Sequence, residues 1–141
     1  IEEACIGCHL CEVGCITEHS ATKDPVKAFL HAKERPISRC TVEEFDGGVI
    51  SISTTCRHCD MPDCLQACIS GAIQKLADGR VLIDSYKCVG CWSCVMACPY
   101  GAVQRNLKKK KANKCDLCPD REVPACVSAC PNRALVYKEG E

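Results

Sequence analysis

The chain has 141 residues, enough for one domain or two small ones. Val, Ile, Leu and Phe make up about a fifth of it, which excludes a large apolar core. The 18 basic and 18 acidic residues balance, so charge does not indicate nucleic-acid binding, and no apolar run is long enough to span a membrane. The distinctive feature is 17 cysteines, sixteen of which form four runs of four.

The first run has the spacing C-x2-C-x2-C-x3-C of bacterial ferredoxins. It consists of Cys5, Cys8, Cys11 and Cys15. The cysteine-poor stretch that follows, residues 16–55, is polar and irregular from His19 to Pro36. Residues 49–53 then alternate between apolar and polar, which predicts a half-buried strand.

The second and third runs enclose a hairpin signal. Run two widens the middle gap to four residues and contains Cys56, Cys59, Cys64 and Cys68. In residues 72–84, apolar positions flank Asp78-Gly79, which predicts a β-hairpin. Run three repeats the spacing of run one, precedes Pro99, and contains Cys88, Cys91, Cys94 and Cys98.

Residues 104–114 carry the basic segment from Lys108 to Lys111 and are interpreted as a linker. The fourth run has a seven-residue gap, precedes Pro131, and contains Cys115, Cys118, Cys126 and Cys130. We expect short helices before the last cysteine of runs two, three and four, at residues 65–67, 95–97 and 127–129.

Each run fits the ligands of a [4Fe–4S] cluster, which takes four cysteine thiolates. In two-cluster ferredoxins the last cysteine of a run binds the neighbouring cluster. On this rule the inner runs form the sets Cys56, Cys59, Cys64, Cys98 and Cys88, Cys91, Cys94, Cys68. If the outer runs pair likewise, their sets are Cys5, Cys8, Cys11, Cys130 and Cys115, Cys118, Cys126, Cys15. The sequence thus predicts four [4Fe–4S] clusters.

The predicted fold is α+β: two nested bacterial-ferredoxin-like two-cluster units with short helices and hairpins and little regular core. Residues 56–103 form the inner unit, and residues 1–55 with 104–141 form the outer unit. Because apolar residues are scarce, metal coordination must supply much of the folding free energy.

Three other uses of cysteine fit less well. Structural zinc sites typically use two separated C-x2-C knuckles, whereas each run here has three cysteines and then one more. A disulfide scaffold is disfavoured by the odd cysteine count and the clustered spacing. A catalytic cluster with an open iron, or a [3Fe–4S] centre, would lack one thiolate, and no run lacks one.

Several residues outside the ligand sets keep two interpretations. Cys40 is expected to be a small buried residue, with a reactive thiol or a shared ligand as the alternative. His58 either donates a hydrogen bond near a cluster sulfur or faces solvent, and Trp92 is expected to pack over a cluster. The lysine run is a solvated face, a charge-compensating segment or a docking patch for an acidic partner. The remaining histidines are expected at the surface: His9, His19 and His31.

Three segments carry a family resemblance. They are Cys56-Arg57-His58-Cys59, residues 88–92 with 98–102, and residues 114–118 with 124–126. With four runs in this order, the chain resembles four-cluster polyferredoxin electron-transfer subunits, especially the small soluble ones of carbon monoxide dehydrogenase, hydrogenase, formate dehydrogenase and tungsten aldehyde oxidoreductase complexes. The resemblance implies the pairing of run one with four and two with three. It also implies a catalytic oxidoreductase subunit of molybdenum/tungsten, nickel or hydrogenase type as one partner and a second redox partner.

The sequence shows no nucleotide-binding glycine motif and no recognisable site for flavin, nicotinamide or molybdopterin. We therefore expect an electron-transfer subunit in the cytoplasm of an anaerobic or facultative organism, not an enzyme, with no nucleic-acid partner and no direct membrane span. Two alternatives are a free soluble polyferredoxin without a fixed partner and a structural bridge in a larger or filamentous assembly.

Overall fold

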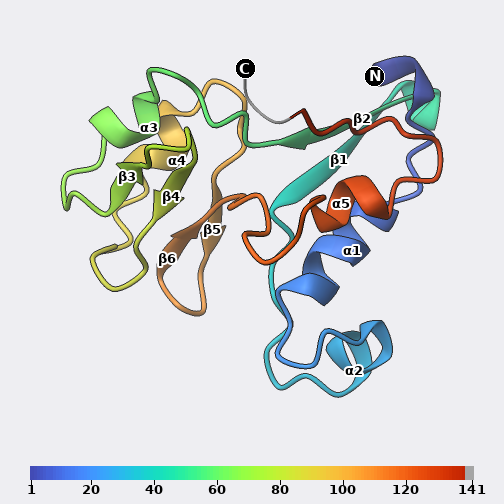
Figure 1. Ribbon diagram of the computed structural model, residues 1–141, viewed down its shortest axis with the longest axis horizontal. Helices are drawn as coiled ribbons and strands as arrows, with labels where there is room; N and C mark the ends of the chain where they lie inside the picture. Colours follow the sequence, from blue (N-terminus) through green and yellow to red (C-terminus); the bar gives the residue numbers. More distant parts are fainter. Residues whose placement is uncertain (139–141) are drawn as a thin grey trace. The chain divides into compact units, whose positions relative to one another are not determined.

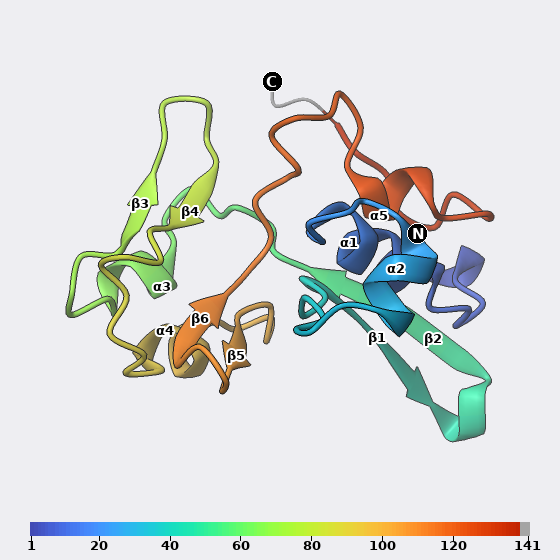
Figure 2. The ribbon, with the colours of Figure 1, turned by 90° about the horizontal axis from the view of Figure 1, so that it is seen from below.

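The computed structural model describes residues 1–138, which form two compact units. Unit 1 combines residues 1–54 with residues 118–138, and unit 2 is the continuous stretch Thr55–Leu117. The regular elements of the described residues are short helices and separate two-stranded sheets, joined by turns and loops (Figure 2). This confirms the predicted mixture of helices and strands with little regular core.

Unit 1 has more helix than the sequence predicts. Its helices and 3-10 turns are η1 (Glu2–Ala4), α1 (Leu10–Glu18), α2 (Pro25–Leu30), η2 (Asp46–Gly48) and α5 (Ala125–Ser128). Its paired strands are β1 (Cys40–Phe45) and β2 (Ile50–Thr55), the latter ending one residue beyond the unit (Figure 1). The strand expected at 49–53 is therefore confirmed with a small shift.

Helix α2 lies in the stretch that the sequence analysis takes as irregular, and that expectation is wrong here. Asp24 caps the helix, since its Oδ1 accepts from the Lys27 backbone N–H at 2.9 Å, and Pro25 occupies the first turn. Both are standard helix-start signals. Six residues are too few for a clear apolar period, so only these signals mark the helix.

Helices α1 and α5 pack against each other in unit 1 through a glycine (Figure 1). A Cβ on Gly14 would lie 2.9 Å from the Ala129 Cβ and 3.0 Å from the Ala125 carbonyl oxygen. Any larger residue would push the helices apart. Gly14 thus holds two distant stretches of the sequence, and the cysteines on them, in one unit.

Unit 2 consists of two short helices and two hairpins. Its elements are α3 (Asp63–Gln66), β3 (Ile73–Lys75), β4 (Val81–Ile83), α4 (Ser93–Ala97), β5 (Gln104–Asn106) and β6 (Lys111–Asn113). Strands β3 and β4 are antiparallel, with Ile73 opposite Ile83, and Gly79 turns between them with φ of +84°. The predicted hairpin at 72–84 is confirmed, as are the short helices expected in runs two, three and four.

The basic segment 104–114 is a second hairpin, so its interpretation as a linker is wrong. Strands β5 and β6 are antiparallel, with Gln104 opposite Asn113 and Asn106 opposite Lys111. The Asn106 side chain accepts from the Lys109 backbone N–H at 3.0 Å and closes the turn. Four consecutive lysines hide this hairpin in the sequence, because they supply no apolar alternation.

Each unit has a small core that is rich in sulfur. In unit 1 it consists of Cys11, Cys15, Cys40, Val42 and Cys126. In unit 2 it consists of Cys64, Ile73, Val81, Cys94 and Val103. Cysteines occupy core positions that aliphatic side chains fill in a larger domain. A metal bound by these sulfurs would therefore contribute directly to the stability of each unit.

Candidate metal centre

The four cysteine runs share one backbone feature. The second residue after the first cysteine has positive φ in every run: Gly7 (+63°), His58 (+48°), Gly90 (+71°) and Leu117 (+62°). This left-handed step turns the chain so that its N–H groups face inward, which favours anions. In two runs that N–H reaches the first cysteine: His58 N donates to Cys56 Sγ at 3.4 Å, and Leu117 N to Cys115 Sγ at 3.3 Å.

Three cavities are each lined by four cysteines, and each combines three members of one run with the last member of another. The first, in unit 2, is lined by Cys56, Cys59, Cys64 and Cys98. The second, also in unit 2, is lined by Cys68, Cys88, Cys91 and Cys94. The third, in unit 1, is lined by Cys5, Cys8, Cys11 and Cys130.

Unlike the cysteines around the three cavities, the cysteines of the fourth predicted set do not all lie in one unit. Cys15, Cys118 and Cys126 belong to unit 1, and Cys115 belongs to unit 2. Within unit 1, Cys15 and Cys126 are both buried and share a core with Cys40. Hydrogen bonding to Cys40 lowers the pKa of both Cys15 and Cys126.

Backbone N–H groups donate to cysteine sulfurs at several further positions. Ala134 N lies 3.2 Å from Cys130 Sγ, and Arg39 N lies 3.2 Å from Cys15 Sγ. A sulfur that accepts N–H hydrogen bonds is stabilised as the thiolate, the form that binds iron. Burial acts in the opposite direction and raises the pKa of Cys94 to about 11, so a bound metal is needed to keep that sulfur ionised.

The first cavity contains a polar atom without a protein partner. The Val81 backbone N–H donates to His58 Nδ1 at 2.9 Å, so the ring proton must be on Nε2. His58 Nε2 is buried and has no hydrogen-bond partner among the described residues, although its ring lines the cavity beside Cys56 and Cys59. Burial, followed by the charge of Lys114, lowers the pKa of His58 to about 4, so the ring is neutral. A sulfur-rich group in this cavity would supply the missing acceptor.

Lys114 lines the same cavity and is almost fully buried. Its Nζ donates to the Val81 carbonyl oxygen and, at 3.2 Å, to the Cys115 carbonyl oxygen. A buried ammonium is costly unless an anionic group compensates it. The sequence analysis counts Lys114 only as part of a basic segment, because no local pattern distinguishes a buried lysine from an exposed one.

Aromatic residues flank the two cavities of unit 2. The Arg57 guanidinium lies 4.3 Å from the centre of the Tyr100 ring, and both residues line the first cavity. Trp92 lines the second cavity, as expected of a residue that packs over a cluster. The donor set, the inward N–H groups and the unpaired His58 Nε2 all fit an anionic iron–sulfur group.

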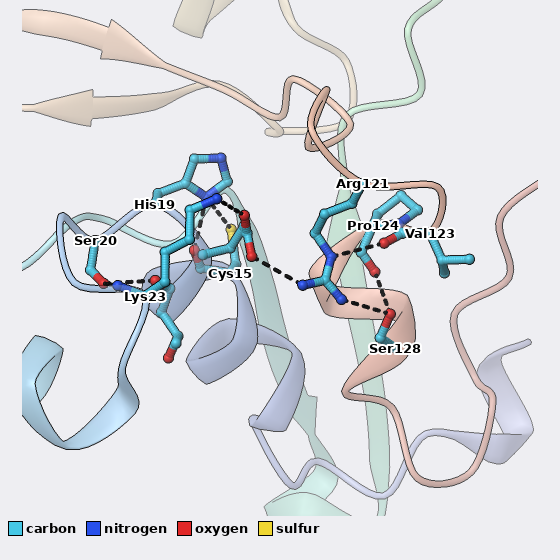
Figure 3. A network of polar contacts seen from close by, with 10 residues as sticks. Cys15, His19, Ser20, Lys23, Arg121, Val123, Pro124 and Ser128 are labelled. Atoms are coloured by element: carbon cyan, nitrogen blue, oxygen red, sulfur yellow. Dashed lines mark hydrogen bonds and ion pairs between the residues drawn. The ribbon is translucent and has the colours of Figure 1, made fainter.

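The remaining histidines have local roles in unit 1. His9 is exposed, and hydrogen bonds to Glu12 (3.0 Å) and Glu44 (3.3 Å) raise its pKa. The His19 ring is half-buried rather than at the surface, and its Nδ1 lies 2.8 Å from the Cys15 carbonyl oxygen (Figure 3). His31 is exposed. Among residues 1–138, no helix has the length and apolar character needed to cross a membrane.

Comparison with known proteins finds similarity to iron–sulfur and electron-transport proteins. A family described as a 4Fe-4S dicluster domain matches residues 48–139. The chain is 39% identical over 148 residues to the electron transport protein HydN of Escherichia coli (strain K12), covering 94% of this chain and 81% of that protein. It is 36% identical over 151 residues to the B subunit of anaerobic dimethyl sulfoxide reductase from the same strain, covering 94% and 68%. An iron-sulfur protein of Rhodospirillum rubrum is 36% identical over 152 residues, covering 93% and 75%.

Proposed function

The chain belongs to the 4Fe–4S dicluster family, and on that premise we propose that it is an electron-transfer subunit with four [4Fe–4S] clusters. The family match and the kinds of relative confirm an iron–sulfur electron-transfer protein that is not itself an enzyme, as the sequence predicts. The number of clusters, their ligands and the partners are the proposal. The observation that carries it is the set of three cavities, each lined by four cysteines.

The proposed ligand sets are those of the sequence analysis. Three of them coincide with the cavity linings, which supports the rule that the last cysteine of a run serves the neighbouring site. The fourth set, Cys115, Cys118, Cys126 and Cys15, rests on the repeat of the same spacing. With these ligands the chain forms two nested two-cluster units, the inner one within residues 56–103.

When bound, the clusters supply one-electron redox chemistry. The protein's own residues hold the sites and set their environment. The inward N–H groups at the turns stabilise thiolates, the Arg57–Tyr100 pair and Trp92 limit the access of water, and Lys114 places a positive charge beside the first cavity. Cross-ligation by Cys68 and Cys98 keeps the two sites of unit 2 close together, as electron hopping requires.

The partner proposed for the chain is a catalytic oxidoreductase subunit of molybdenum/tungsten, nickel or hydrogenase type. One relative is the B subunit of a reductase, and another is named an electron transport protein. Both names fit a protein that passes electrons between a catalytic subunit and a second redox protein. Shared ancestry over 94% of this chain supports the same arrangement here.

The test is metal analysis of the protein purified anaerobically from its native host without removal of partners. We expect about 16 irons per chain, from four four-iron clusters. About half that amount would overturn the four-cluster proposal, and stoichiometric zinc with little iron would overturn the iron–sulfur assignment of the sites. A co-purifying subunit with nickel, molybdenum or tungsten would support the partner class, whereas an isolated monomer with full iron would favour the free polyferredoxin.

A further inference from the structure

The neutral charge of the whole chain conceals a strong asymmetry. Unit 2 has ten lysine and arginine residues against five aspartates and no glutamate. Unit 1, over residues 1–54 and 118–138, has eight basic residues against eleven acidic ones. The electrostatic field of such an uneven charge distribution steers charged partners toward one part of a surface and away from another.

The excess positive charge of unit 2 is concentrated on the β5–β6 hairpin. The side chains of Lys108, Lys109 and Lys110 are exposed at its turn, beside Leu107, whose relative exposure is 67%. Arg105 on β5 is exposed as well. The hairpin therefore presents four cations and an apolar side chain, the composition of a surface that binds an acidic protein.

The hairpin is held directly on the first cysteine turn of run three. Lys111 Nζ donates to the Cys88 carbonyl oxygen, and Ala112 N donates to Cys88 Sγ at 3.5 Å. A Cβ on Gly90 would lie only 2.2 Å from the Lys110 carbonyl oxygen, so a residue with a side chain is excluded there. The lysine turn is thus fixed against the loop that carries Cys88 and Cys91.

The same loop carries an exposed cysteine of the second cavity, which is lined by Cys68, Cys88, Cys91 and Cys94. Cys91, one of its four cysteines, is exposed, and Val89 beside it is 63% exposed. Electron transfer between proteins requires the two redox groups to approach closely. A site that combines an exposed ligand with a basic rim is suited to brief contact with an acidic redox protein.

We propose that the β5–β6 hairpin is the docking surface for an acidic one-electron carrier, which exchanges electrons with unit 2 at the Cys91 loop. This rests on the proposed function, because it assumes a redox-active group in the second cavity. One electron passes between carrier and site, the donor losing what the acceptor gains, and no bond is made or broken. The lysines raise the rate of encounter rather than the driving force.

The experiment uses the full chain with its clusters, prepared anaerobically. Flavodoxin hydroquinone, an acidic flavoprotein, and the methyl viologen radical, a small cation, serve as alternative electron donors in stopped-flow measurements at low and high salt. In the Lys108→Glu/Lys109→Glu variant we expect the rate with flavodoxin to fall about tenfold or more at low salt, and the difference to vanish at high salt. The rate with viologen should not fall.

The matched control is Lys27→Glu/Lys33→Glu, which changes the net charge equally at exposed positions of unit 1. An equal fall in this control, or no fall in the hairpin variant, overturns the proposal. Salt-dependent self-association that the hairpin substitutions abolish, with unchanged flavodoxin rates, also overturns it and assigns the hairpin to a second copy of the chain. Failure of the unsubstituted protein to accept electrons from either donor would instead refute the proposed function.

Discussion

Units 1 and 2 use the same cysteine spacing but build their interiors differently. Unit 2 contains two four-cysteine cavities, and its core includes Ile73, Val81 and Val103. Unit 1 contains one such cavity among its described residues, and four of its five buried core residues are cysteines. Unit 2 is also one continuous stretch, whereas unit 1 joins the two ends of the chain.

The difference indicates how a short chain can hold many metal sites. In unit 2 a hairpin between two cysteine runs and a helix of four or five residues within each run supply much of the frame around the cavities. Unit 1 must bring together segments more than 100 residues apart, and it does so with the α1–α5 contact at Gly14. We therefore expect unit 1 to depend more on bound metal than unit 2.

The largest effect should follow the removal of iron. Anaerobic chelation should abolish the cooperative unfolding transition and with it the whole folding free energy, on the order of 5–10 kcal/mol. Circular dichroism would detect the loss, and hydrogen exchange would resolve it by unit, with unit 1 losing protection first. An apo-protein that melts cooperatively, with both units protected, would refute the expectation.

The next test replaces the cross-ligating cysteines, one in each unit. Cys98→Ser and Cys130→Ser should each remove about four irons, because each residue lines one cavity with three cysteines of another run. Electron transfer through the chain should stop in Cys98→Ser, while partner binding survives. Iron analysis and electron paramagnetic resonance check the prediction, and Cys40→Ser is the control. Full iron in either variant would contradict the ligand sets.

A packing comparison is available because Val81 and Cys40 are the largest fully buried side chains among the described residues, one in each unit. Val81→Ala should cost about 2 kcal/mol, because it leaves a cavity, and Cys40→Ala should cost about 1 kcal/mol. Anaerobic urea unfolding measures both. Loss of iron from Cys40→Ala would identify Cys40 as a ligand and refute its interpretation as a packing residue.

The sequence predicts those parts of the fold that depend on local chemistry. The Asp78-Gly79 hairpin and the short helices of runs two, three and four are marked by turn residues and cysteine spacing. The three cavity linings also match sets predicted from spacing alone.

The features that the sequence does not predict depend on contacts between segments distant in the sequence. The β5–β6 hairpin depends on the approach of Lys110 to Gly90, and the burial of Lys114 depends on carbonyl oxygens of Val81 and Cys115. Neither contact leaves a pattern in the neighbouring sequence. The packing of α1 on α5 likewise joins segments that no local signal relates.

A smaller effect is expected at His58, which lines the first cavity of unit 2 and should influence the midpoint potential of the cluster there. Since His58 Nε2–H has no acceptor among the described residues, our proposal has it donate to the cluster in the first cavity. His58→Leu removes this hydrogen bond, worth about 1 kcal/mol, and should lower one midpoint potential by about 40 mV. A redox titration followed by electron paramagnetic resonance measures the change. His58→Gln, which keeps an N–H donor, should restore part of it, and His31→Leu should have no effect. Equal shifts in the leucine and glutamine variants would refute the assigned hydrogen bond.

The smallest effect concerns Glu18 at the end of α1, which forms ion pairs with Lys23 and with Arg121 in the segment before α5. Glu18 accepts from Lys23 Nζ at 2.7 Å and from Arg121 Nη1 at 3.1 Å, and Arg121 also donates to Ser128 Oγ at 3.4 Å (Figure 3). The hydrogen bond from Lys23, followed by that from Arg121, lowers the pKa of Glu18. Because the folded pKa is depressed, this stabilisation is complete above the ordinary carboxyl value and is lost as pH falls through the folded value.

Arg121→Gln should therefore cost about 0.5 kcal/mol, the usual contribution of a partly exposed pair. The cost should stay constant between about pH 8 and pH 5, where Glu18 is ionised in both the folded and the unfolded state. Anaerobic urea unfolding of the variant, beside the exposed control Arg133→Gln, measures it. A cost that changes within this pH range would mean that Arg121 stabilises unit 1 through a group other than Glu18. A cost of about 2 kcal/mol or more would mean that this contact, rather than bound metal, holds the two ends of the chain together.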